Sequence, residues 1–86
     1  MKKISKYREG VLRANKDINC LNNSSFFKRL SSEKKKKYIH DKHEFFDKMQ
    51  YEVRANRGAK ASDFYRGLAM GYGYFYHTGK LLWTIF

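Results

Sequence analysis

The chain has 86 residues, of which 19 are lysine or arginine and 8 are aspartate or glutamate, giving a formal net charge of +11. Hydrophobic residues make up 42% of it and aromatic residues 17%. This is too apolar for a disordered basic tail and predicts a single folded domain over residues 1–86. The excess positive charges of so small a domain repel one another, and a polyanionic partner would offset this repulsion. Nucleic acid fits best, because its binding releases counterions from the phosphates.

The composition also bears on location and oligomeric state. Cys20 is the single cysteine, so no intramolecular disulfide can form, and we expect a small, partly buried side chain in a reducing cytoplasm. The apolar runs are too short to span a bilayer, which predicts a soluble, cytoplasmic protein with no membrane partner. A domain of this size buries a thin core. A homodimer, which would hide more apolar surface, is therefore expected.

The first segment has the periodicity of a helix. Ser5 is a candidate N-cap, and Gly10 is expected to be the weak point of the helix, costing about 1 kcal/mol relative to alanine. The polar residues 22–25 predict a break, followed by a short helical turn over 26–30. Steps of three and four residues place the apolar side chains on one helical face: Ile4, Tyr7, Val11, Ala14, Ile18 and Leu21.

The central segment predicts a long helix from Ser32 to Arg57, ended by Gly58. At 100° per residue, its apolar side chains fall within an arc of about 120°. The expected buried face carries Tyr38, Ile39, Phe45, Phe46, Met49 and Val53. The expected polar face carries His40, His43, Glu44, Asp47, Lys48 and Arg54.

Two structures fit the last segment. One is a helix capped by Ser62 and ending at Thr78, with Gly79 in the left-handed conformation, although the helix would contain three glycines: Gly67, Gly71 and Gly73. The other is a β-hairpin that pairs 74–76 with 82–86. A lone hairpin is only marginally stable, which favours the helix. The predicted fold class is therefore a mainly α domain of three to four helices, with an α+β domain carrying a C-terminal β-hairpin as the alternative.

Clustered basic residues are the candidate RNA-binding groups. The run Lys34, Lys35, Lys36 and Lys37 opens the central helix, where the positive end of the helix dipole disfavours lysine. Lysines placed where they destabilise a helix, with no structural benefit, indicate a functional role. Lysines beside the free backbone N–H groups of a helix start can bind phosphate. We expect at least two groups to share a surface. The other predicted RNA-binding residues are Lys2, Lys3, Lys6 and Arg13 near the N-terminus, and Arg54, Arg57, Lys60 and Arg66 around the last break.

Aromatic residues gather near the end of the chain. Core or dimer packing accounts for most of them, but one or two of Tyr72, Tyr74 and Tyr76 are candidates for stacking on unpaired bases, worth roughly 1–3 kcal/mol per base. No nucleophile–base pair, paired carboxylates or glycine-rich phosphate loop is present, so we expect no catalytic residue, no cofactor and no enzyme activity. The histidines and acids of residues 40–47 have the spacing of ordinary surface residues rather than of a metal site.

The small size and the Lys- and Tyr-rich composition resemble those of early proteins of large bacteriophages that disable host machinery. In size and basic character, with no shared motif, the chain is similar to counter-defence proteins of the type of the RNA-binding inhibitor of type III toxin–antitoxin endoribonucleases. The segment Tyr65–Gly71 (Tyr-Arg-Gly-x-x-x-Gly) also resembles the arginine–glycine helix of bacterial ribosome modulation factors. The resemblance implies a phage protein of the host cytoplasm that inhibits an RNA-dependent enzyme, such as a toxin endoribonuclease, by binding its RNA.

The sequence thus predicts a non-catalytic, RNA-binding helical domain that contacts phosphates with lysine and arginine, and whose partners are RNA and a host nucleoprotein enzyme. RNA is preferred over DNA because no recognition helix with base-reading side chains is apparent, whereas exposed tyrosines suit single strands. The alternative is a protein-only inhibitor whose basic surface docks on an acidic patch of a host enzyme, since steered association would use the same charges.

Overall fold

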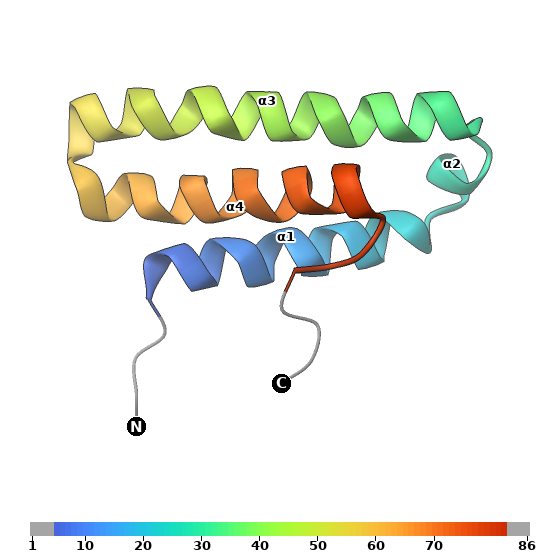
Figure 1. Cartoon of the computed structure of the whole chain (residues 1–86), viewed down its shortest axis with the longest axis horizontal. Helices are drawn as coiled ribbons and strands as arrows, with labels where there is room; N and C mark the ends of the chain where they lie inside the picture. The colour runs from blue at the N-terminus through green and yellow to red at the C-terminus, as the bar shows by residue number, and fades with distance from the viewer. Residues whose placement is uncertain (1–4, 83–86) are drawn as a thin grey trace.

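The computed structural model describes residues 5–82 and shows a helical protein (Figure 1). Over that range the helices are α1 (Lys6–Asn22), α2 (Ser25–Lys28), α3 (Ser32–Arg57) and α4 (Ala59–Thr78), and the described part contains no strand. The predicted mainly α fold is confirmed. The hairpin alternative is wrong for its first strand, because residues 74–76 are helical and Gly79 ends α4 with φ 73°. Most of its second strand, residues 83–86, lies outside the described residues.

The three long helices form one layer, with α4 between α1 and α3 (Figure 1). The molecule measures 39 × 31 × 20 Å. Helices α1 and α4 run in the same direction, α3 runs against both, and α2 closes one end of the layer. The outer helices pack mainly on α4 rather than on each other. Helix α4 is therefore covered along two sides, and most of its residues from Gly67 to Gly73 are buried.

The helix ends follow from local polar residues and glycines. Ser5 Oγ accepts a hydrogen bond from the Arg8 N–H at 3.1 Å, which confirms the predicted cap of α1. The predicted bounds of α3 are also confirmed, and Gly58 follows it with φ 93°. The predicted cap at Ser62 is wrong. Because Gly58 turns the chain within one residue, α4 already begins at Ala59, and the buried Ser62 hydroxyl donates to the Ala59 carbonyl at 2.8 Å.

Small residues let α1 and α4 touch backbone to backbone along what we call the glycine seam, formed by Gly10, Ala14, Gly67 and Gly71. A Cβ added to Gly10 would collide with the Phe64 carbonyl oxygen and lie 3.0 Å from the Gly67 Cα. One added to Gly67 would collide with the Tyr7 carbonyl oxygen, and one on Gly71 would lie 2.5 Å from the Ala14 Cβ. Gly10, expected to be a weak point, is instead a close-packing site, because side chains on either helix would force the two apart.

The buried face of α3 is rotated from the expected one. Ile39 and Val53 are buried as predicted, but Phe45 is 55% exposed. His43, expected on the polar face, lies against α4, where its Nδ1–H donates to the Ala69 carbonyl at 2.7 Å. A Cβ on Gly73 would lie 2.8 Å from that nitrogen, so the missing side chain of Gly73 makes room for the ring. The polar ring is accommodated at the helix contact because its N–H is hydrogen-bonded.

Tyr72 belongs to the core that joins the three long helices. It is 4% exposed, and its ring stacks on Phe46 at a centroid distance of 5.6 Å. Its hydroxyl lies 3.5 Å from Asp17 Oδ2. Burial raises the pKa of the Tyr72 phenol well above its usual value of 10.0, and the Asp17 carboxylate adds to the rise. The predicted base-stacking role of Tyr72 is therefore wrong, because its ring is enclosed by the core.

This buried phenol predicts a loss of stability in alkali. The unfolded chain ionises Tyr72 near pH 10 while the folded state keeps it neutral, so its contribution is complete below pH 10 and is lost as pH rises further. We expect Tyr72→Phe to lose less free energy of unfolding between about pH 9 and pH 11 than the wild type does. Urea unfolding at both pH values measures the difference, with Tyr51→Phe, a 65% exposed ring, as the control. Equal losses in wild type and Tyr72→Phe would contradict the prediction.

Candidate nucleic-acid interface

The lysine run opens α3 at the end of the layer where α2 lies. Lys37 is paired with Asp41, with Nζ 3.0 Å from the carboxylate oxygen. Among the described residues, no carboxylate lies within 4.0 Å of the ammonium groups of Lys34, Lys35 or Lys36. The Lys35 ammonium lies 5.8 Å from the centre of the Phe27 ring. Three of the four predicted lysines thus keep their charge available for an external anion.

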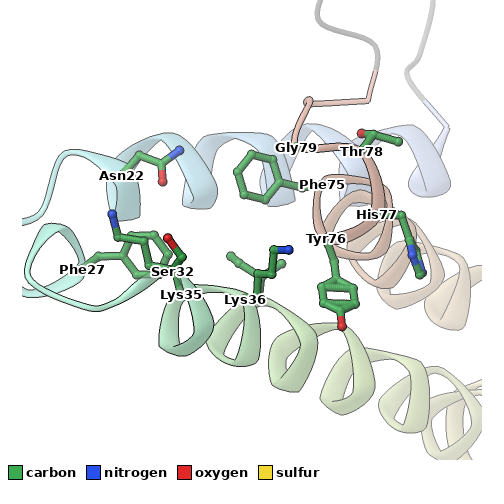
Figure 2. Close-up of a pocket in the computed structure, with 11 residues that line it drawn as sticks. Asn22, Phe27, Ser32, Lys35, Lys36, Phe75, Tyr76, His77, Thr78 and Gly79 are labelled. Carbon is green, nitrogen blue, oxygen red and sulfur yellow. The ribbon is translucent and has the colours of Figure 1, made fainter.

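A cavity of about 440 Å³ opens beside these lysines, and we call it the terminal pocket. Helix α4 stops at Thr78, before it reaches the end of the layer that α2 closes (Figure 1). The terminal pocket is lined by residues at this end of α4 and by residues of the other three helices. No acidic residue lines the pocket. Figure 2 shows its wall: Asn22 from α1, Phe27 from α2, Ser32, Lys35 and Lys36 from α3, and Phe75 and Tyr76 from α4.

The two helix ends that meet at the terminal pocket give it an electrostatic polarity. The first turn of α3 contributes the positive end of a helix dipole and the last turn of α4 the negative end of another. At the α4 end, the Gly79 N–H donates to the Phe75 carbonyl at 2.8 Å, and the Thr78 hydroxyl donates to the Tyr74 carbonyl at 2.8 Å. The α3 side therefore favours an anion, and the α4 side favours hydrogen-bond donors.

A second basic group lies at the opposite end of the layer. Arg54, Arg57 and Lys60 surround the turn at Gly58, are exposed, and have no ion pair among the described residues. Arginines in the last turn of α3 also complement its dipole. At 1.5 Å per residue, this group lies about 30 Å along α3 from the lysines. The predicted residues of α3 thus gather at two ends.

The remaining predicted cations are placed less favourably. Arg66 lies over the Tyr7 ring, with its guanidinium carbon 4.8 Å from the centroid, and so joins the start of α1 to α4. Lys6 pairs with Glu9 at 3.3 Å and Arg13 with Asp17 at 3.1 Å. Lys2 and Lys3 lie outside the described residues. The start of α1, which carries Lys6, lies at the same end of the layer as the start of α4, which carries Lys60 (Figure 1).

The three candidate stacking tyrosines fall in different surroundings. Tyr72 is buried, whereas Tyr74 is 38% exposed. Tyr76 is half-buried and lines the terminal pocket, with its ring 5.0 Å from that of His40. Sequence reasoning did not assign Asn22, Phe27 or Ser32 to a site. Because these residues flank chain breaks, where polar residues also serve as caps, the sequence contains no separate signal for their place in a pocket.

The histidine and cysteine side chains and the apolar content of the helices bear on other kinds of site. His40 Nε2 lies 3.4 Å from Glu44 Oε1, but no group of three or more His, Cys, Asp or Glu side chains within residues 5–82 could hold a metal ion. Cys20, expected to be partly buried, is exposed on α1. None of the described helices combines the length and apolar character needed to cross a membrane. Comparison of the chain with protein-family models, curated proteins and solved structures finds no match.

Proposed function

We propose that the protein is a non-catalytic RNA-binding protein that holds phosphates with lysine and arginine side chains. The observation that carries the proposal is the grouping of Lys34, Lys35 and Lys36 beside a pocket without acidic residues. Five of the eight acidic residues lie on α3 itself, yet these three ammonium groups stay unpaired among the described residues. Unpaired cationic side chains can replace the counterions around phosphates, and the release of those counterions favours binding.

RNA is favoured over duplex DNA by the shape of the basic surface. Consecutive lysines fan around the first turn of α3 and present no row of side chains to a major groove, so they suit phosphate contacts. Exposed Tyr74 and pocket-lining Tyr76 offer rings to unpaired bases, which RNA loops and bulges supply. An RNA that contacts both basic ends must extend over about 30 Å.

The test is purification without nuclease, followed by titration of a labelled single-stranded RNA over a series of salt concentrations. We expect RNA to copurify, seen as a raised ratio of absorbance at 260 nm to that at 280 nm. We also expect a log–log salt slope of about −4, because six unpaired cations contribute about 0.7 each on a single strand: Lys34, Lys35, Lys36, Arg54, Arg57 and Lys60. A flat salt dependence, with a nuclease-resistant complex containing an acidic protein, would instead establish the protein-only inhibitor.

A further inference from the structure

The terminal pocket has the size and composition of a ligand site. Its volume of about 440 Å³ falls within the range of roughly 300–1,000 Å³ that is usual for small-molecule sites. We infer that it holds one unpaired nucleotide of the bound RNA, with the phosphate on Lys35 and Lys36 and the base against Phe75 and Tyr76. This inference rests on the proposed function and names the part of the RNA that this site takes.

The α3 side of the pocket is built for phosphate. The Lys36 side chain extends into the cavity in Figure 2, and it has no ion pair among the described residues. Lys35 is partly buried, and its ammonium group lies 5.8 Å from the centre of the Phe27 ring, which also lines the pocket. The Ser32 hydroxyl lines the same side and, among the described residues, makes no hydrogen bond, so it can donate to a phosphate oxygen.

The α4 side of the pocket is suited to a base. Phe75 projects toward the cavity across from Lys36, and Tyr76 forms the adjoining wall (Figure 2). Of the last four carbonyl groups of α4, that of Phe75 accepts from the Gly79 N–H, whereas those of Tyr76, His77 and Thr78 accept no hydrogen bond among the described residues. These three carbonyl groups can accept from the amino and imino groups of a base. Asn22, on the opposite rim, has a side-chain amide with no hydrogen bond among the described residues, so it offers both a donor and an acceptor.

The shape of the pocket selects an unpaired nucleotide. It is a recess between helix ends, with Lys35 and Lys36 on the α3 side and the rings of Phe75 and Tyr76 on the α4 side. A paired base is stacked on both faces and has its Watson–Crick edge occupied, so it cannot enter such a recess. A bulged or terminal nucleotide can enter, and proteins bind such nucleotides by stacking combined with edge hydrogen bonds.

The test compares two fluorescein-labelled RNA hairpins that differ by a single bulged adenosine. We expect the wild-type protein to bind the bulged hairpin roughly 5- to 150-fold more tightly than the fully paired one, the range that stacking of one base supplies. Fluorescence anisotropy at fixed salt gives both dissociation constants. The informative quantity is their ratio, because phosphate contacts elsewhere on the protein contribute equally to both hairpins.

Two variants test the site and two serve as matched controls. Tyr76→Leu removes the ring but keeps an apolar side chain, and Lys36→Ala removes an exposed ammonium group. Each is expected to lower the preference for the bulge by at least fivefold. Tyr51→Leu and Lys48→Ala change the same residue types at exposed positions of α3 outside the pocket, and are expected to keep the wild-type preference.

Each outcome separates the inference from the proposed function. If the wild type binds neither hairpin, the proposed function is wrong. If it binds both equally, RNA binding stands and the pocket inference is overturned. A preference that survives both pocket variants also overturns it, as does tighter binding of a labelled oligoglutamate peptide than of the bulged hairpin. If circular dichroism shows that Tyr76→Leu is unfolded, the exposed Lys36→Ala decides alone.

Discussion

Replacement of Gly10 by alanine is expected to lower the free energy of unfolding by about 2–3 kcal/mol. On helix propensity alone, the substitution would stabilise α1 by about 1 kcal/mol. The glycine seam reverses the sign, because the added methyl group would meet the backbone of α4, including the Leu68 nitrogen at 2.8 Å. Backbone atoms cannot move aside as a side-chain rotamer can, so α1 and α4 must separate and lose contacts along their length.

The matched control for this prediction is Gly73→Ala. There the added methyl group would meet the His43 ring, which can rotate away at the cost of its hydrogen bond to Ala69. We expect a smaller loss of about 1 kcal/mol. Urea unfolding monitored by circular dichroism measures both variants. Equal or greater stability of Gly10→Ala than of the wild type would show that the seam does not hold the two helices in direct contact.

Replacement of Lys34, Lys35 and Lys36 together by alanine is expected to weaken RNA binding at least tenfold without lowering stability. Each lysine that contacts a phosphate contributes about 0.7 to the log–log salt slope on a single strand, so the slope should fall by about 2. Stability should be unchanged or slightly higher, because cations near a helix N-terminus are unfavourable. Anisotropy over a salt series measures the binding, and thermal unfolding measures the stability.

A charge-matched triple variant separates local contacts from net charge. Lys16, Lys42 and Lys48 lie outside the terminal pocket, and replacing all three by alanine removes the same total charge. We expect that variant to retain most of the affinity for RNA. Equal weakening by the two triple variants would mean that RNA responds to overall charge rather than to this end of α3. A clear fall in melting temperature for the first variant would assign its lysines to the fold.

Much of the secondary structure could be predicted because its signals are local. The bounds of α3 follow from a serine-rich start and from Gly58, and the end of α4 follows from Gly79 in the left-handed conformation. Which face of each helix is buried depends on the neighbouring helices, so it was harder to predict from the sequence. His43 looked like a surface residue because histidine is polar, and only the approach of α4 at Gly73 explains its inward position.

The candidate site shows the same division between local and tertiary information. The lysine run is a property of consecutive residues and was visible in the sequence. The terminal pocket depends on where α4 stops relative to α1, α2 and α3, which no single segment encodes. Tyr72 and Tyr76 are four residues apart on one helix, yet one lies in the core and the other lines the pocket. Nothing in the sequence indicated that the last helix lies in the middle of the layer.

The central position of α4 also sets an order for folding. Helices α3 and α4 are joined at Gly58 and can pair by local contacts, whereas α1 must find α4 across the rest of the chain. Bringing distant segments together has a larger entropic cost, which slows the step. We therefore expect the α3–α4 hairpin to form early and α1 to dock last. A refolding chain would then display its lysines before Asn22 of α1 completes the recess beside them.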